Sequence, residues 1–407
     1  MCCRPAVPIS VHAGVVARSA TRAGAEVTER GAAMQLLKLM QNLVRVGEPL
    51  PWGVRDVEGK LLLAKGHIVA AEGQLLALLA RGAFVDAEEA RAAARAAAEA
   101  PKAERPASLF TLWERMLWQL ERVLKSVDEP GFGARVDELA RHVVQLTDRD
   151  ADIAIYLCVR QDPKRLSIYG LAHAIHCALV GLLVARRLGW DEARVRTLMK
   201  AALTMNVALL ELQGRMAVQG VPPTASQQAA VRAHPALGVE LLCRAGVEDA
   251  EWLQAVGEHH ECPGGGGYPA GLADPGDMAC LLRHVDMFTA KISPRGSRAP
   301  MATPAAAREL FQDDRGGPLA AALIKELGIY PPGELVTLKS GEHAVVLRRT
   351  GNAGAPIVAS ITDRSGMPVV GTVVRDSAKP EFTIVGANGD KGLVQRMPPE
   401  RLYGVPE

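Results

Sequence analysis

One short stretch decides how the rest of the chain is interpreted: HHECPGGGGYP, from His259 to Pro269. Two adjacent imidazoles and a carboxylate close a segment with helical apolar spacing, and four glycines follow after Cys262 and Pro263. The pattern predicts a helix that stops at a loop whose backbone can approach a ligand closely. Neighbouring helical residues diverge by about 100°, so His259 and His260 suit two partners, or one metal and one substrate. Taken alone, the pair favours a simpler interpretation, exposed histidines at a helix end before a flexible turn.

The composition is that of a globular protein without a large electrostatic field. The 407 residues are 48% hydrophobic and 23% charged, which suggests two or three domains with real cores. With 47 basic against 45 acidic residues the formal net charge is +2, so no whole-protein charge argues for a nucleic acid polymer or a membrane surface. Any anionic ligand must therefore be held locally.

The cysteines and the apolar runs indicate a cytoplasmic protein with no membrane span. The seven cysteines are an odd number without a Cys-x-x-Cys pair, which fits a reducing compartment. The longest apolar run, Cys177 to Ala185, is stopped by Arg186 and Arg187, well short of the roughly 18 residues expected of a membrane span. The opening residues are broken by prolines and make a poor secretory signal.

Changes of pattern along the chain predict five segments. Residues 1–33 have a disordered character, and translation is expected to begin at Met34, where helical apolar spacing starts. The other segments are a small β/α module at 34–86, an alanine-rich helical linker at 87–107, a helical domain at 108–328 and a small β module at 329–407. The expected fold is mainly α, a helical bundle with a small N-terminal α/β module and a small C-terminal β-barrel-like module.

The predicted helical domain carries polar residues at helix ends and on helix faces. One helix is expected to end at Gly189, and the next to run from Asp191 to Gly214. The candidate metal ligands lie on successive helices or helix ends: His173, His234, His259, His260 and Asp286. Facing helices of a bundle build interior metal sites in this way. Imidazole and carboxylate without thiolate suit iron, manganese or zinc in a hydrolytic centre.

A basic turn follows the last helix that carries a candidate ligand. Arg295 and Arg298 flank a Gly-Ser pair directly after Pro294. Two guanidinium groups in a tight turn are suited to holding a phosphate.

From Tyr169 to about Arg298 the chain resembles the HD-GYP domain, the subgroup of bacterial HD phosphohydrolases associated with cleaving cyclic di-GMP. The resemblance rests on Tyr169-x3-His173, Ala201-Ala202-Leu203, His234-Pro235-x2-Gly238-x2-Leu241-Leu242, His259-His260-Glu261 with Gly267-Tyr268-Pro269-x-Gly271-Leu272, and Asp286-x3-Ala290. The order and spacing of these motifs agree over about 130 residues.

The resemblance implies an HD-type helical bundle around a centre of two or three metal ions, iron or manganese. It implies that the metal ligands are His173, His234, His259, His260 and Asp286. It implies substrate binding by Gly267, Tyr268 and Pro269, with Lys291, Arg295 and Arg298 near the substrate phosphates. In the family, the Gly-Tyr-Pro loop is also implicated in contacts with diguanylate cyclase domains.

The sequence departs from the family pattern at the signature His-Asp pair. After Ala201-Ala202-Leu203 it reads Thr204-Met205-Asn206, and Leu209 replaces the downstream lysine. An asparagine amide offers one neutral oxygen and cannot neutralise two cations as a bridging carboxylate does. Methionine is a soft ligand that is poorly matched to a hard centre. Gly264 also replaces the aspartate usually found before Gly-x-Gly-Tyr-Pro.

The expected function is that of a degenerate HD-GYP protein in cyclic di-GMP signalling. Such a protein binds a ligand or a partner, holds one metal ion rather than two, and hydrolyses the nucleotide slowly or not at all. The alternative is an active metal-dependent phosphodiesterase with a reduced ligand set, in which His176 acts as a substitute ligand one turn from His173. By themselves, His173 and His176 favour a pair of hydrogen-bonded histidines on a half-buried helix face.

Overall fold

The structure, a computed structural model, describes residues 35–39, 44, 46–99, 107–388 and 397–404. The chain divides into two compact units, residues 1–105 and residues 106–407. The predicted disordered start at 1–33 and the predicted translation start at Met34 lie outside the described residues. The five segment boundaries drawn from the sequence stay predictions.

A four-stranded antiparallel sheet organises the N-terminal unit. Its strand order is β1 (Leu36–Lys38), β4 (Phe84–Asp86), β2 (Val54–Arg55) and β3 (Leu61–Leu63). Helix α1 (Glu72–Ala80) buries Leu75 in the same apolar cluster as Val54 and Val85, and α2 (Ala87–Glu99) follows β4 directly. The prediction of a helix that begins near Met34 is wrong, because Leu36–Lys38 form strand β1. Pairing of this strand with β4 outweighs the weak helical spacing of the few apolar residues there.

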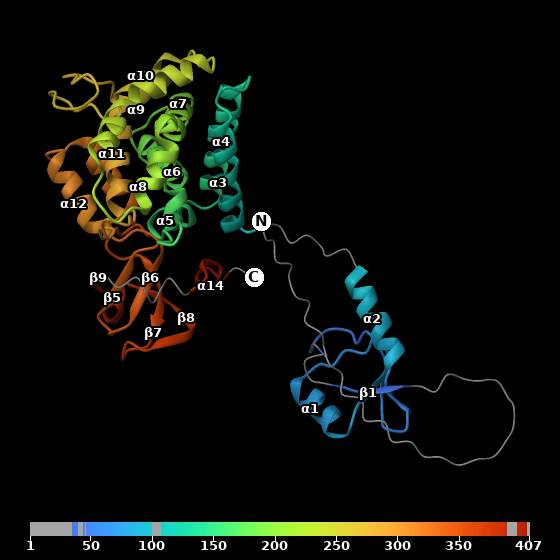
Figure 1. The fold of residues 1–407 in the computed structure, drawn as a ribbon. Coiled ribbons are helices and arrows are strands. Elements are labelled where there is room, and N and C mark those ends of the chain that lie inside the picture. The colour runs from blue at the N-terminus through green and yellow to red at the C-terminus, as the bar shows by residue number, and fades with distance from the viewer. Residues whose placement is uncertain (1–34, 40–43, 45, 100–106, 389–396, 405–407) are drawn as a thin grey trace, which may run out of the picture. The chain divides into compact units, whose positions relative to one another are not determined.

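Helices make up most of the C-terminal unit, and α6 (Tyr169–Arg187) lies in the middle of them (Figure 1). The other long helices are α3 (Leu109–Lys125), α4 (Phe132–Arg149), α5 (Ala151–Val159), α7 (Glu192–Thr204), α8 (Leu210–Val218), α9 (Ala225–Arg244), α10 (Ala250–Glu258), α11 (Asp277–Ile292), α12 (Thr303–Asp313) and α13 (Pro318–Leu327). Helix α6 contacts α3, α4, α5, α7, α8, α11 and α13. This central position makes α6 the core around which the bundle is built.

The central helix is both long and apolar. The segment Leu166–Arg187 is long and apolar enough to cross a membrane, but 83% of its 18-residue apolar window is buried inside the protein. Such burial is what the core helix of a helical bundle requires, because apolar residues on all sides must then pack against neighbouring helices.

The helix predicted to run from Asp191 to Gly214 is wrong, because it breaks at Met205-Asn206. Helix α7 ends at Thr204, a 3-10 turn follows at Val207–Leu209, and α8 begins after it. The Thr204 hydroxyl donates to a carbonyl one turn earlier, at 2.7 Å, and accepts the indole N–H of Trp252, at 2.8 Å. A buried hydroxyl that bonds back to its own helix favours bending at that point. The break determines where the side chains of Met205 and Asn206 point.

A five-stranded antiparallel sheet packs against one end of the bundle (Figure 1). Its strand order is β8 (Pro368–Asp376), β7 (Ile357–Thr362), β6 (His343–Arg348), β5 (Leu335–Leu338) and β9 (Ile384–Ala387). Tyr156 on α5 shares an apolar cluster with Leu335 and Leu347, and Arg349 pairs with both Asp152 and Glu326. In the described part of the chain the sheet is open, with β8 and β9 at its edges. The prediction of a mainly helical fold with two small β modules is confirmed.

Candidate metal centre

The five predicted metal ligands lie in the C-terminal unit in two groups. His234 of α9 and His259 and His260, which follow α10, form the first group. His173 of α6 and Asp286 of α11 form the second group together with Cys177. In each group every side chain offers one potential ligand atom, and these atoms all lie within 4.8 Å of one another.

The first group presents two imidazole lone pairs to the same point. The Nδ1 atoms of His234 and His259 lie 2.5 Å and 2.7 Å from the carbonyl oxygens of Val231 and Val256. A carbonyl oxygen only accepts, so each Nδ1 carries the proton and each Nε2 offers a lone pair. The two Nε2 atoms are nevertheless only 3.1 Å apart. Two facing lone pairs repel each other unless a cation or a proton lies between them.

A divalent cation fits this arrangement better than a proton does. Burial lowers the pKa of His234 to about 4 and holds the pKa of His259 well below its usual range, so both rings are neutral at neutral pH. Two nitrogen ligands at about 2.1 Å from one ion, at a right angle, lie about 3.0 Å apart. The donor set and its spacing therefore fit a divalent metal ion.

The second group is built around one anionic ligand. The Nε2 atom of His173 lies 2.6 Å from Oδ1 of Asp286. Burial opposes ionisation of Asp286, but its hydrogen bond and electrostatic interaction with His173 act in the opposite direction, and its pKa lies well below its usual range. Burial raises the pKa of the Cys177 thiol well above its usual value. Asp286 is thus the one carboxylate in the two ligand groups found among the described residues.

A cavity of about 330 Å³ connects the two groups. Predicted residues on its wall are His173, His234, His260, Asp286, Asn206, Leu209, Tyr268, Arg295 and Arg298. Its wall therefore combines metal ligands, cationic groups and an aromatic ring, which is the composition of a binding site for a polar ligand.

The two arginines of the basic turn lie on this wall, but the predicted lysine does not. Arg295 donates to the hydroxyl of Tyr169 at 2.6 Å, and its guanidinium lies 4.9 Å from the centre of the Tyr169 ring. Arg298 donates to the backbone carbonyl of Ala290. Lys291 instead pairs with Glu309 at 2.5 Å. The cavity therefore offers two guanidiniums for an anion, while Lys291 is held elsewhere by its ion pair.

The residues that replace the His-Asp pair point in different directions. Met205 is fully buried, with an exposed fraction of 0%, and belongs to the main apolar core. Asn206 and Leu209 line the cavity. The Asn206 amide makes no side-chain hydrogen bond with the part of the chain that the structure describes. The position at which the HD-GYP resemblance expects a carboxylate therefore carries a neutral amide on the cavity wall.

The glycine loop is held by Glu261, not by the metal centre. One carboxylate oxygen of Glu261 accepts the N–H groups of Ala270 and Gly271, and the other accepts that of Leu272, at 2.7, 3.1 and 2.9 Å. A Cβ on Gly267 would lie 2.5 Å from Cα of Glu261, so this close approach requires glycine. The sequence interpretation grouped Glu261 with the histidine pair, whereas its carboxylate faces the loop.

The Gly-Tyr-Pro residues contribute to the cavity through a single side chain. The Tyr268 ring stacks on His260 with centroids 4.5 Å apart and an interplanar angle of 24°. Tyr268 lines the cavity, but Gly267 and Pro269 do not. The loop therefore touches the centre through an aromatic face, and its two other residues shape the backbone.

Changing Glu261 to glutamine should loosen the loop. The new NH2 group would face backbone donors in place of an acceptor, and we expect the free energy of unfolding to fall by about 2–4 kcal/mol. Backbone amide exchange at Ala270, Gly271 and Leu272 should accelerate. Glu258→Gln is the matched control, because Glu258 accepts a single loop N–H, from Gly276 at 2.8 Å. Unchanged exchange at residues 270–272 in Glu261→Gln would contradict this role.

His176 does not reach the metal ligands. It lines a different cavity on another face of α6, and it belongs to neither ligand group. The substitute-ligand role considered from the sequence is therefore not supported by its position. A three-residue spacing places two helical side chains on roughly the same face, but it does not bring both to one point.

Two residues at the centre were not among the predicted site residues. Cys177 lies four residues after His173, a spacing that places both on one helix face and could have identified it. Tyr169 stacks on His173 with centroids 5.2 Å apart and links it to Arg295 through its hydroxyl. Arg295 and Tyr169 are far apart in the sequence, and only the fold brings them together. The contact between them therefore had no local signal in the sequence.

Comparisons with known proteins agree with the motifs. No family model matches the sequence. The chain is 26% identical over 238 residues to the cyclic di-GMP phosphodiesterase PA4108 of Pseudomonas aeruginosa, and this match covers 57% of the chain and 55% of that relative. The chain therefore spans about half the length of the curated relative. Among solved structures it is similar to Bd1817, an HDG"Y"P protein from Bdellovibrio bacteriovorus, at 16% identity and a TM-score of 0.45, covering 72% of this chain and 99% of that one.

A helical bundle in which histidine and aspartate side chains from facing helices come together has the architecture expected of an HD-type protein. Its motif order, from Tyr169-x3-His173 to Asp286-x3-Ala290, and the similarity to the Pseudomonas relative point to one type of HD protein. The chain is similar to HD-GYP proteins, with Met205-Asn206 in place of the His-Asp pair.

Proposed function

We propose that this protein acts in bacterial cyclic di-GMP signalling as a degenerate HD-GYP protein, binding the nucleotide or a protein partner with weak or no hydrolysis. One observation carries the proposal: Asn206, not a carboxylate, faces the cavity beside the ligand groups. The similarity to a relative named as a cyclic di-GMP phosphodiesterase supports the choice of nucleotide. A cytoplasmic location is part of the same proposal.

The retained ligands support the binding of a divalent ion, iron or manganese. His234, His259 and His260 would hold one ion, with His173 and Asp286 available at the second group. Such an ion, when bound, supplies Lewis-acid activation of water and of a phosphoryl oxygen. Asn206 brings no negative charge to neutralise a second ion, so we propose one metal ion rather than two.

The cavity wall supports the binding of a dinucleotide with two phosphates. Arg295 and Arg298 offer guanidinium groups that suit phosphate oxygens. The exposed part of the Tyr268 ring offers a surface for contact with a base, as aromatic side chains commonly do. None of these contacts needs the missing carboxylate, so binding can persist where hydrolysis is lost.

The second candidate function is an active phosphodiesterase that uses the reduced ligand set. It is favoured because all five predicted ligands lie in two compact groups. It is disfavoured by Asn206 and by the position of His176, which lines another cavity. Contacts between the Gly-Tyr-Pro loop and diguanylate cyclase domains remain part of the proposal for a partner-binding role.

Metal analysis and calorimetry on the same preparations test the proposal. We expect about one iron or manganese ion per chain, nucleotide binding to the unmodified protein, and binding roughly tenfold weaker in His260→Ala. Turnover of cyclic di-GMP is measured in manganese and in ferrous iron. Linear dinucleotide or GMP appearing at several turnovers per minute would overturn the proposal in favour of the active enzyme. Failure of both proteins to bind the nucleotide would leave only the protein-partner role.

A further inference from the structure

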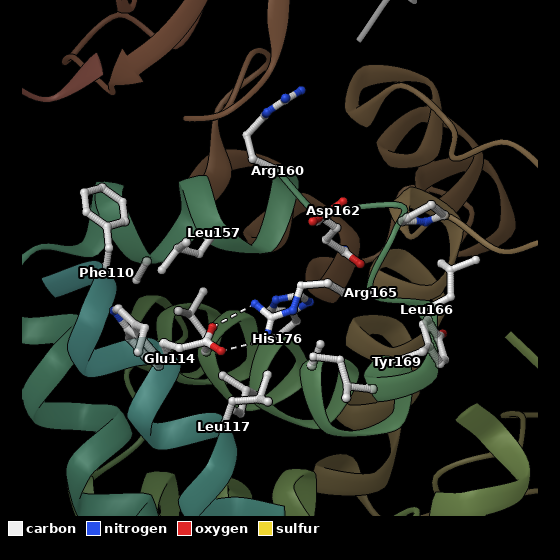
Figure 2. Close-up of a pocket in the computed structure, with 18 residues that line it drawn as sticks. Phe110, Glu114, Leu117, Leu157, Arg160, Asp162, Arg165, Leu166, Tyr169 and His176 are labelled. Carbon is white, nitrogen blue, oxygen red and sulfur yellow. Dashed lines mark hydrogen bonds and ion pairs between the residues drawn. The ribbon is translucent and has the colours of Figure 1, made fainter. Parts of the chain in front are cut away.

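A second cavity lies in the C-terminal unit (Figure 2). No member of either candidate ligand group lines it. It has a volume of about 190 Å³ and lies between α3, α5 and the first half of α6. Much of its wall is apolar, including Phe110, Leu117, Leu157, Leu166, Ile175 and Leu179. None of the five predicted metal ligands lines it. A ligand of this cavity therefore contacts none of the predicted metal ligands.

Two buried polar atoms of the residues that line this cavity have no hydrogen-bond partner among the described residues. They are Nδ1 of His176 and Nε1 of Trp113, whose residues are 9% and 6% exposed. A buried polar group without a partner costs about 1–3 kcal/mol, so such groups are normally paired. The indole N–H can only donate, whereas a neutral imidazole offers one donor and one acceptor. A hydroxyl group, which donates and accepts, matches both residues.

The charged residues on the wall balance one another. They are two acids and two bases: Glu114, Asp162, Arg160 and Arg165. Arg165 forms a two-pronged ion pair with Glu114, at 2.8 and 2.7 Å, beside His176 (Figure 2). Figure 2 also shows the Arg160 side chain pointing away from His176. The wall therefore carries no net charge, which favours an uncharged ligand.

The size and the wall together define the ligand. An engineered apolar cavity of about 150 Å³ holds benzene, so about 190 Å³ accommodates a benzene ring with one small substituent. The rings of Phe110, Trp113 and Tyr169 on the wall favour an aromatic ligand. We propose that this cavity binds a small uncharged aromatic molecule with one hydroxyl group, a phenol, whose hydroxyl pairs with Trp113 and His176.

Tyr169 lies on the walls of both cavities, so it would contact the phenol and the metal-centre cavity at once. Its hydroxyl accepts from Arg295 on the side of the metal centre. Phenol binding would therefore place a ligand against a residue that also positions an arginine of the first cavity.

Phenol and toluene are the probes for a test by NMR and calorimetry on the full chain. Each is titrated to millimolar concentration while the indole N–H signals of the five tryptophans are recorded. We expect phenol to shift mainly one signal, the one that is missing from Trp113→Phe. Trp113→Phe should weaken the binding of phenol roughly fivefold and leave the binding of toluene unchanged. Only phenol can accept the hydrogen bond that the indole N–H donates. Trp190→Phe, outside the cavity, is the matched control.

A cavity-filling variant locates the site independently of Trp113. Ala172 lines the cavity, and Ala172→Leu should abolish the binding of both probes while leaving the other indole signals in place. Phenol shifts that survive in Ala172→Leu would place the ligand elsewhere and overturn the proposal. It would also be overturned if neither probe shifted an indole signal of the unmodified protein, or if Trp113→Phe weakened both probes equally.

Discussion

The Asn206→Asp variant is expected to bind Mn²⁺ roughly tenfold more tightly than the unmodified protein and to hydrolyse cyclic di-GMP roughly a hundredfold faster. The side chain lines the cavity and makes no side-chain hydrogen bond with the described residues, so the substitution adds a charge without breaking a contact. A carboxylate can neutralise a second cation where the amide cannot. Calorimetry with Mn²⁺ and a product assay measure the two effects.

Two further variants test whether the position and the charge matter. Asn206→Ala removes the amide without adding charge, and it should leave Mn²⁺ affinity near that of the unmodified protein. Met205→His should not restore a ligand, because Met205 is fully buried in the core. An imidazole there lacks partners and should cost about 2–4 kcal/mol of unfolding free energy. Equal Mn²⁺ affinities in Asn206→Asp and Asn206→Ala would rule out the carboxylate argument.

The Asp286→Asn variant is expected to weaken Mn²⁺ binding roughly a hundredfold. Asp286 is the one carboxylate in the two ligand groups of the described chain, and asparagine keeps its size while removing its charge. Its hydrogen bond with His173 can be kept by the amide oxygen, so the fold should persist. Metal content after dialysis and calorimetric titration with Mn²⁺ measure the loss.

A second histidine–aspartate pair in the same unit supplies the matched control. Asp314 lies 3.1 Å from Nε2 of His284, outside the cavity of the metal centre. Asp314→Asn makes the same chemical change in the same unit and should leave Mn²⁺ binding intact. If Asp286→Asn retained its metal, or if both variants lost it equally, Asp286 would not be acting as a ligand.

Local signals in the sequence were sufficient for some helix ends. The helix expected to start at Asp191 does so, because the Asp191 side chain accepts the N–H groups of Ala193 and Arg194 at the start of α7. The helix expected to end at Gly189 is α6, whose last residue is Arg187. Errors fell where contacts distant in sequence decide the outcome. Pairing with β4 made a strand of Leu36–Lys38, and packing around Thr204 broke the helix predicted across it.

The identity of the candidate ligands, and the neutral amide among them, was readable from the sequence by itself. Residue type limits which groups can bind a hard cation, and the motif order placed the ligands on successive helices. Only the tertiary structure decided that Met205 enters the core while Asn206 enters the cavity, and that Glu309 draws Lys291 away. The physical reason is that side-chain direction depends on where a helix ends and which distant neighbours pack against it. Such contacts leave no periodic trace along the chain.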